Sequence, residues 1–382
     1  MFNINIKRPQ NATFPPPILP EDILPRLETL NRVFKSLKTP NSYILITSPE
    51  NRRYFSGFIA SDPMISESSG CLLIGQNKRY LLSDSRYVLA AAAEAPAFEF
   101  VLVNSSWGKV LDKILGPKDI LWFEPLYLSV ASYGDFTQNL KAKIRPLPLD
   151  LDDLRIVKSP KEVDLIKKAL AITEEAIGLL FDSFVPGWTE AEAAFFLDTN
   201  FRALGGEGAA FETIVATGPN AALPHAIPSD RVIEAGEAVV IDCGARYQGY
   251  AADCTRTLIY GEPKDWQKEI YRTVREAQTL AIADLSPKVS GAMVDRIARD
   301  HIAKAGYGEF FNHSLGHGVG LAVHENPRLA FNDNRALPVG AVVTVEPGIY
   351  LPDKGGVRLE QLVLITESGA LVLNEDDHFY DF

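Results

Sequence analysis

The sequence predicts an α+β fold over residues 155–382, preceded by a smaller α/β domain over residues 1–150. In the larger part, two helical segments followed by strands occur twice, an order that suits helices packed on one side of an antiparallel sheet. In the smaller part, short strands alternate with helices, as they do in α/β domains. The composition changes at "PLPLDLDDLRIVKSP" (146–160), where prolines are followed by acidic residues, and this change marks the domain boundary.

The elements of the first domain follow from local patterns. After a Pro-rich and irregular start we expect one helix near 21–38. The run "GCLLIGQNKRYLLSD" predicts two strands joined by a turn at Gln76-Asn77. The expected order is strand 42–48, this hairpin at 70–84, helix 85–95 and strand 98–103.

Two capping boxes predict helix starts in the second domain. Ser159 with Glu162 begins the first helix, and Pro160 takes its first helical position. Thr189 with Glu192 begins the second. We expect these helices to end at Pro186-Gly187 and Gly205-Gly206, and a second pair to span about 264–285 and 290–305. Strands are expected at 211–217, 237–243, 250–259, 318–323, 341–350 and 357–366.

Composition limits the classes of partner. The net charge of −11 argues against nucleic acid or an anionic membrane, and no apolar run approaches the length that crosses a bilayer. Three cysteines, an odd number in a long chain, indicate a reducing compartment without a disulfide framework, so we expect a cytoplasmic protein. Cys243 and Cys254 are expected to be packing residues.

Two aspartates in "VVIDCGARYQGYAADCTRT" (239–257) carry the first chemical signal. If the chain turns at Tyr247-Gln248, Asp242 and Asp253 lie directly opposite each other, about 4.5–5.5 Å apart, where like charges repel. A cation between them would offset that repulsion. The alternative is a pair of solvated acids on an exposed edge, and this stretch alone leaves both interpretations open.

Histidines and further acids follow at strand-like positions. "NHSLGHGVGLAVHENP" (312–327) holds three of the six histidines in a Gly-rich segment that feeds a strand. Glu346 ends an apolar strand in "VVTVEPGIY", and Glu360 interrupts another in "GGVRLEQLVLIT". A buried, unpaired glutamate is costly, and an ion pair with Arg358 is one alternative. Four carboxylates with imidazole suit two divalent metal ions bridged by carboxylates.

These residues carry a family resemblance. Five of them, in the order Asp242, Asp253, His317, Glu346 and Glu360, resemble the ligand set of the pita-bread metallopeptidases. That family comprises methionine aminopeptidase, Xaa-Pro aminopeptidase and Xaa-Pro dipeptidase (prolidase). The motifs "IDCGARYQGYAADCTRT", "HSLGHGVGLAVHENP", "VEPGIY" and "GVRLEQ" carry the similarity, with Gln361 standing where the family often has Asp. The resemblance implies the pita-bread fold and two divalent ions per subunit, Mn²⁺ or else Co²⁺, Fe²⁺ or Zn²⁺. The implied ligands are Asp242, Asp253, His317, Glu346 and Glu360.

The N-terminal region narrows the subfamily. "ILITSPENRRYFSGF" (44–58) and "YLLSDSRYVLAAAAEA" (80–95) resemble the creatinase-type N-terminal domain that proline-specific members carry. His225 and His313 also fit that branch. The expected function is therefore that of an Xaa-Pro aminopeptidase, which hydrolyses the bond before a penultimate proline through a metal-bridging hydroxide. The alternatives are an Xaa-Pro dipeptidase, a metal-dependent non-peptidase enzyme on the same fold, or a binding module with a vestigial site.

The resemblance also implies roles and partners. Asp253 and Glu360 would bridge the ions, and Glu346 would pass a proton to the leaving nitrogen. His324 and His225 would stabilise the oxyanion or orient the substrate carbonyl. The substrate is expected to be a proline-containing peptide and the assembly a homodimer, with neither nucleic acid nor membrane as partner. Residues expected at the substrate are His313, Tyr350 and Arg358, although Tyr350 could only pack and Arg358 could only offset the ligands' charge.

Overall fold

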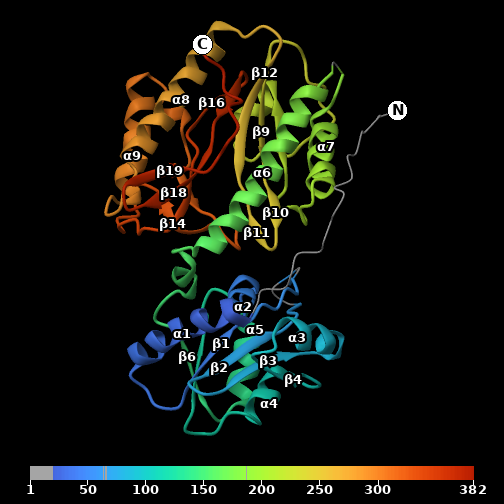
Figure 1. The fold of residues 1–382 in the computed structure, drawn as a ribbon, viewed down its shortest axis with the longest axis vertical. Coiled ribbons are helices and arrows are strands. Elements are labelled where there is room, and N and C mark those ends of the chain that lie inside the picture. Colours follow the sequence, from blue (N-terminus) through green and yellow to red (C-terminus); the bar gives the residue numbers. More distant parts are fainter. Residues whose placement is uncertain (1–19, 63, 65–66, 186) are drawn as a thin grey trace. The chain divides into compact units, whose positions relative to one another are not determined.

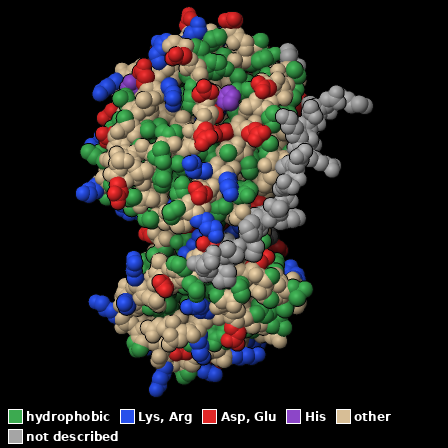
Figure 2. All heavy atoms as spheres, viewed as in Figure 1, with side chains coloured by type: hydrophobic (Ala, Val, Ile, Leu, Met, Phe, Trp, Pro, Cys, Tyr) green, Lys and Arg blue, Asp and Glu red, His purple; other side chains and the backbone are tan. Residues whose placement is uncertain are grey.

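The structure, a computed structural model, describes residues 20–62, 64, 67–185 and 187–382. The described chain forms two compact units, one ending at Leu154 and the other spanning Arg155–Phe382 (Figure 1). The predicted irregular start and the helix end at Pro186 lie outside the described residues, at least in part. Among the residues described, no helix is long and apolar enough to cross a membrane. On the face shown in Figure 2, acidic and basic side chains are interspersed over both units.

The first unit is built on one six-stranded sheet in the order β4-β3-β2-β1-β5-β6. Strand β2 runs antiparallel to both of its neighbours, and the other pairs are parallel. The strands are β1 Ser42–Ile46, β2 Cys71–Gly75, β3 Arg79–Ser83, β4 Glu99–Leu102, β5 Ile120–Phe123 and β6 Lys143–Pro146. The helices are α1 Pro20–Leu37, α2 Pro49–Ser56, η1 Ser85–Tyr87, α3 Val88–Glu94, α4 Trp107–Asp112, α5 Val130–Asn139 and η2 Leu151–Arg155.

The expected helix near 21–38 and the turn at Gln76-Asn77 are confirmed by α1 and by the β2–β3 hairpin. No helix or strand was predicted for the segments that form α2, α4, α5, β5 and β6. Strand β5 is only four residues long and lies beside β1, about 80 positions earlier in the chain. Such a short buried strand has little periodicity of its own, so its pairing is visible only in three dimensions.

The second unit contains the two predicted helix pairs. The capping boxes at Ser159/Glu162 and Thr189/Glu192 are both present, with reciprocal bonds between side chains and backbone. In Figure 1, α6 and α7 lie on one half of this unit, and α8 and α9 lie together on the other. The helices are α6 Pro160–Ser183, α7 Glu190–Ala203, η3 Gly218–Ala222, α8 Asp265–Asp284, α9 Gly291–Lys304 and η4 Gly308–Phe310.

The strands of this unit are antiparallel, in the orders β11-β10-β7, β12-β9-β8, β14-β13-β15-β18-β19 and β16-β17. The first half holds β7 Gly208–Ala209, β8 Ile214–Thr217, β9 Glu237–Cys243, β10 Ala245–Tyr247, β11 Tyr250–Ala251 and β12 Cys254–Tyr260. The second holds β13 Gly316–Gly318, β14 Glu325–Leu329, β15 Val342–Val345, β16 Gly348–Leu351, β17 Gly355–Arg358, β18 Gln361–Thr366 and β19 Gly369–Val372. Helices α8 and α9 and these strands enclose one apolar core, with Ile270, Val294, Val343 and Val363 fully buried.

The register of the β9–β12 hairpin corrects one prediction. Asp242 lies opposite Thr255, so the expected direct opposition of Asp242 and Asp253 is wrong. The turn falls at Gln248 and Gly249, one residue later than predicted, with φ of 47° and 80°. A tight hairpin turn of this kind needs positive φ at both central residues, which glycine adopts without strain.

The C-terminal tail after β19 is hydrogen-bonded to β12, the strand that directly follows Asp253. Arg256 of β12 is fully buried and bonds Asp376 through both Nε and Nη2. Its Nη1 donates to the carbonyl oxygens of Glu360 (2.7 Å) and Thr255 (3.0 Å). The tail therefore holds the guanidinium that supports the backbone at Glu360.

Glu174 of α6 shares a hydrogen bond with Asp376 in this cluster. Burial and the bond with Asp376 raise the pKa of Glu174 to about 7. Burial acts in the same direction on the pKa of Asp376, but the Arg256 hydrogen bond outweighs it and lowers that pKa to about 2. Glu174 is therefore the partner that carries the proton.

We expect the pH dependence of stability to report this shared proton. Because the pKa of Glu174 is raised from 4.5 to about 7, the folded chain holds a proton that the unfolded chain loses in that window, so the free energy of unfolding falls as pH rises through it. Glu174→Gln keeps a donor to Asp376 without titrating. Urea unfolding would be measured at about pH 5 and about pH 8. The free energy of unfolding of the variant, relative to that of the wild type, should be higher at pH 8 than at pH 5. An identical pH dependence in both proteins would contradict the shared proton.

Candidate active site

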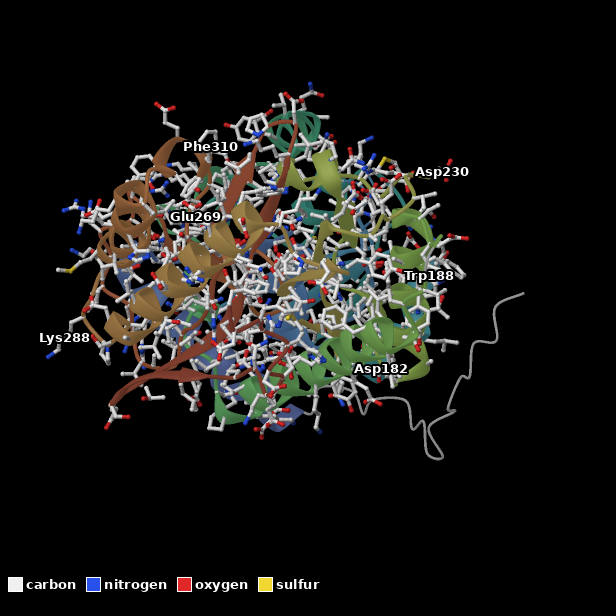
Figure 3. All side chains as sticks on the ribbon, turned by 90° about the horizontal axis from the view of Figure 1, so that it is seen from above. Asp182, Trp188, Asp230, Glu269, Lys288 and Phe310 are labelled. Atoms are coloured by element: carbon white, nitrogen blue, oxygen red, sulfur yellow. The ribbon has the colours of Figure 1, made fainter. Side chains whose placement is uncertain are left out.

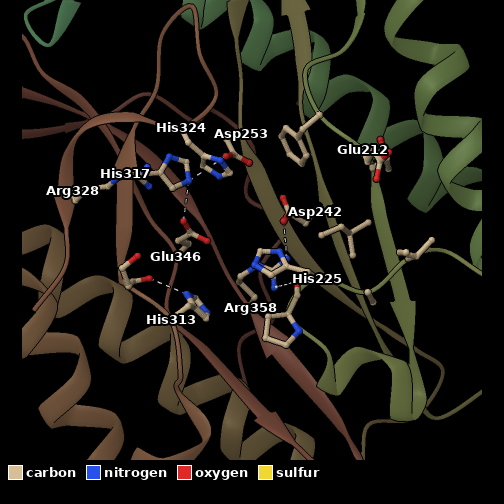
Figure 4. A pocket seen from close by; sticks show the side chains of 17 residues that line it. Glu212, His225, Asp242, Asp253, His313, His317, His324, Arg328, Glu346 and Arg358 are labelled. Atoms are coloured by element: carbon tan, nitrogen blue, oxygen red, sulfur yellow. Dashed lines mark hydrogen bonds and ion pairs between the residues drawn. The ribbon is translucent and has the colours of Figure 1, made fainter. Parts of the chain in front are cut away.

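A cavity of about 530 Å³ in the second unit gathers the predicted residues (Figure 4). One wall is apolar, with Phe211, Ile214 and Ile227, and the others are polar. The acidic, imidazole and guanidinium groups that line it are Asp242, Asp253, Glu346, His225, His313, His317, His324, Arg328, Arg358 and Glu212. Of the predicted site residues, Glu360 and Tyr350 lie just behind this lining, bonded to Thr255 and to Arg358.

Strands place the five predicted ligands. Asp242 lies near the end of β9, and Asp253 directly precedes β12. His317 is the central residue of β13. Glu346 directly follows β15, and Glu360 lies in the break between β17 and β18. Groups up to 118 positions apart in the numbering therefore meet where strands start, end or break.

The side chains form two groups that share one member. Carboxylate oxygens of Asp242, Asp253 and Glu360 lie within 4.8 Å of one another, as do ligand atoms of Asp253, His317 and His324. His317 Nε2 lies 3.2 Å from Glu346 Oε1 and 3.6 Å from Asp253 Oδ2. Asp253 belongs to both groups, so its carboxylate lies where a carboxylate that bridges two ions would be needed.

The donor set fits cations on its own chemistry. Asp242 Oδ1 and Glu360 Oε1 are buried oxygens that have no hydrogen-bond partner within the described part of the chain. Burial, together with the charges of Glu360 and Asp242, raises the pKa of Asp253. Burial and the charges of Glu346 and Asp242 likewise raise the pKa of Glu360. Buried carboxylates that repel one another and keep free lone pairs are suited to divalent cations.

Two threonines orient the carboxylates. Thr255 Oγ1 donates to Glu360 Oε2 at 2.9 Å, and Thr344 Oγ1 donates to Glu346 Oε1 at 3.1 Å. Neither threonine was among the predicted site residues. A signal was available, because Thr255 stands two residues after Asp253 and Thr344 two before Glu346, and residues two apart on a strand share a face.

Arg358 pairs with Asp242 rather than with either glutamate. Its Nη2 donates to Asp242 Oδ2 at 2.7 Å, and its Nη1 donates to the Tyr350 hydroxyl at 2.8 Å. The same hydroxyl lies 2.9 Å from His313 Nε2. Burial raises the pKa of Tyr350 to about 12, so its hydroxyl stays protonated. His313, Tyr350 and Arg358 are thus joined in one series of hydrogen bonds. His313 and Arg358 lie at the cavity surface.

Two further histidines face the cavity from its exposed rim. The His324 ring stands edge-to-face against that of His317, with 4.3 Å between the ring centroids. Burial and His317 lower the pKa of His324 to about 4, which leaves it neutral. His225 approaches from the segment after η3 and lies beside Asp242 and Arg358 in Figure 4. Neutral imidazole can donate a hydrogen bond to a developing negative charge.

This fold and site define a metallopeptidase class, and two family profiles match. Metallopeptidase family M24 matches residues 164–367, and the creatinase/prolidase N-terminal domain matches residues 26–157. The chain belongs to metallopeptidase family M24. The predicted resemblance and the pita-bread fold with a creatinase-type N-terminal domain are confirmed.

Named relatives are similar over most of their length. The chain is 37% identical to an Xaa-Pro dipeptidase of Pyrococcus furiosus over 87% of its own residues and 93% of the relative's. An Xaa-Pro dipeptidase structure from Bacillus anthracis superposes with a TM-score of 0.86 at 34% identity, covering 93% of this chain and 98% of that one. An X-Pro aminopeptidase structure from Thermotoga maritima gives 0.81 at 37% identity, covering 91% and 98%.

Proposed function

We propose that the chain is an Xaa-Pro dipeptidase that uses two divalent ions to hydrolyse the bond before proline. The observation that carries the proposal is a cavity in which a cluster of buried carboxylates is combined with the exposed side chain of Arg328. In an Xaa-Pro dipeptide the terminal carboxylate follows directly after the scissile bond and its proline. A guanidinium binds such a carboxylate strongly. Two similar proteins are named Xaa-Pro dipeptidases, which supports a dipeptidase over the aminopeptidase that was the first expectation from the sequence.

The proposed ligands are the predicted five, Asp242, Asp253, His317, Glu346 and Glu360. The ions, when bound, supply Lewis-acid activation of the carbonyl and of a water molecule. Oxygen-rich ligation with one imidazole suits Mn²⁺, with Co²⁺, Fe²⁺ or Zn²⁺ as alternatives. The homodimer and the cytoplasmic location stay predictions.

The chain's own residues would move the protons. Burial alone would raise the pKa of Glu346, but the hydrogen bond with His317 outweighs it and lowers that pKa to about 2. Glu346 is therefore ionised and can accept a proton and deliver it to the proline nitrogen, which has no N–H of its own in an Xaa-Pro bond. His324, which is neutral, and His225 would each donate a hydrogen bond to the oxyanion. His313 and Arg358 would line the substrate side, with Tyr350 holding both in place.

An Xaa-Pro aminopeptidase is the second candidate. Ile227 lines the cavity and is 81% exposed, so it offers apolar surface to residues that follow the proline of a longer peptide. The similar X-Pro aminopeptidase from Thermotoga maritima is consistent with this interpretation. Either candidate is a proline-specific peptidase. The discriminating property is whether a free carboxylate is required after proline.

Substrate length and Arg328 together separate the candidates. Hydrolysis would be measured before chelation of the ions, after their removal and after they are restored. The rates on an Xaa-Pro dipeptide and on an Xaa-Pro-Xaa-Xaa tetrapeptide would then be compared. We expect the dipeptide to be preferred and Arg328→Ala to raise its KM by roughly 10–100-fold, the size of a lost charged hydrogen bond. Arg335→Ala is the matched control, because Arg335 pairs with Asp333 and lies outside this cavity's lining. Efficient cleavage of the tetrapeptide, with Arg328→Ala affecting both substrates equally, would favour the aminopeptidase.

A further inference from the structure

We propose that Glu190 is a positioning residue that holds the loop 218–229, and with it His225, at the cavity wall. The inference rests on the proposed function for the role of His225. Its structural basis is independent of that function. Glu190 is the first residue of α7 and its side chain is fully buried, yet it takes no part in the ion-binding groups.

One carboxylate binds both ends of this loop. Glu190 Oε1 accepts from Thr217 N at 2.7 Å, at the residue before the loop. Glu190 Oε2 accepts from Ser229 N at 3.1 Å and from Ser229 Oγ at 2.6 Å, at the loop's last residue. Asn220 Nδ2 donates to both oxygens, at 3.1 and 3.0 Å. A charged acceptor so saturated by donors is strongly held, whereas an unsatisfied one would be costly to bury.

Helix capping does not account for this residue. Thr189 and Glu192 already close the capping box of α7. The hydrogen bonds of the Glu190 side chain all reach outside the helix, to the loop and its flanks. The backbone of the same turn docks there too, because Glu190 N donates to Arg231 O and Ala191 N donates to Ser229 O. In Figure 3, Trp188 and Asp230 mark the two sides of this junction along one edge of the view.

The opposite side of the loop is fixed by β17. Arg358 Nη1 donates to Pro224 O at 3.2 Å. The approach of η3 is close, because a Cβ on Gly356 would lie 2.2 Å from Ala221 O. The loop is therefore held between β17 and Glu190. The side chain of His225 is exposed in the cavity, so its position follows from the backbone of this loop (Figure 4).

Glu190→Gln tests the clamp with almost no change in shape. One acceptor oxygen becomes an NH₂ group facing N–H or O–H donors, which releases one end of the loop. We expect kcat/KM on an Xaa-Pro dipeptide to fall about 10²-fold, mainly in kcat, as for a displaced positioning group. Mn²⁺ affinity, measured by titration calorimetry on metal-free protein, should stay within about 2-fold of the wild type.

The matched control is Glu192→Gln, two residues later on the same helix. Glu192 Oε2 accepts from Thr189 N and Thr189 Oγ1. Glutamine keeps one acceptor oxygen there but loses the negative charge at the helix N-terminus, so this change weakens only the cap of α7. We expect this variant to unfold earlier in denaturant while kcat/KM stays within about 2-fold of the wild type. An equal loss of activity in both variants would mean that α7 stability, rather than the clamp, is what activity needs, and would overturn the proposal.

A double-mutant cycle with His225→Ala asks whether Glu190 acts through His225. In the His225→Ala background, Glu190→Gln should change kcat by less than about 3-fold, because the group it positions is already absent. A full effect of about 10²-fold in that background would overturn the assignment.

Hydrogen exchange gives a readout that needs no activity. Amides of residues 217–229 should exchange faster in metal-free Glu190→Gln than in the wild type, with the amides of β12 unchanged. If the wild type cleaves no proline peptide, the proposed function fails, but this measurement still decides the clamp. If Glu190→Gln does not fold, Ser229→Ala removes the 2.6 Å bond to Glu190, together with the bonds that Ser229 Oγ accepts from Arg231 N (3.2 Å) and Asn220 Nδ2 (3.5 Å), and should show the same local change to a smaller degree. Unchanged exchange over 217–229 would overturn the clamp.

Discussion

Replacing His317 with alanine is expected to abolish peptide hydrolysis while leaving the chain folded. His317 is the one imidazole among the five proposed ligands, and its Nε2 lies within 3.6 Å of both Asp253 and Glu346. Residues that only orient a ligand typically change activity by about 10–100-fold, so the loss of a ligand should exceed that range. The measurements are kcat/KM on an Xaa-Pro dipeptide and ion content per chain.

The fold should survive this substitution. The apolar core between α8, α9 and the sheet does not include His317. The bond from His317 N to Thr344 Oγ1 is made by the backbone N–H of His317 and remains in the variant. His301→Ala is the control, because His301 lies on α9 and pairs with Glu276, away from the cavity. Wild-type rates in His317→Ala, or equal losses in both variants, would count against the site.

Asp253→Asn is expected to act in opposite directions on ion binding and on metal-free stability. Asp253 contributes to both side-chain groups, so the variant should lose ions from both positions and fall below detectable turnover. Without ions, burial raises the pKa of Asp253, because its charge is opposed by its apolar surroundings and by Glu360 and Asp242. Above its usual pKa that charge destabilises the folded state. Removing it should raise the free energy of unfolding of the metal-free protein by roughly 1–3 kcal/mol.

The effect of added ions on stability should differ between the wild type and Asp253→Asn. Wild-type protein should gain stability when Mn²⁺ is restored, because an ion that binds only the folded state shifts the equilibrium toward it. The Asp253→Asn variant should gain much less. If this variant loses stability without ions and still binds them normally, the carboxylate is a structural residue rather than a shared ligand.

The sequence predicted features that depend on local chemistry. The capping boxes at Ser159 and Thr189 fix helix starts within a few residues, and both are present. The hairpin turn was missed by one residue, because the positive φ at Gln248 precedes the glycine that signals it. That error misplaced the partner of Asp242 while leaving both aspartates at the site.

The candidate site was predictable for a different reason. Its five proposed ligands follow in an order that resembles a known family, and the structure brings their side chains close together. The groups that hold them were not predictable in the same way. Arg256 and Glu190 act on segments about 100 and 30 residues away, and no local pattern records such contacts. Only the fold reveals which buried charge supports which loop.

Elemental analysis of the purified wild-type chain, after loading with Mn²⁺ and removal of excess ions, tests the central claim most directly. The structure leads us to expect about two ions per chain, and fewer than one in Asp253→Asn, which removes the carboxylate common to both groups. A wild-type chain that retains no ion, or that retains the same number after Asp253→Asn, would contradict the account.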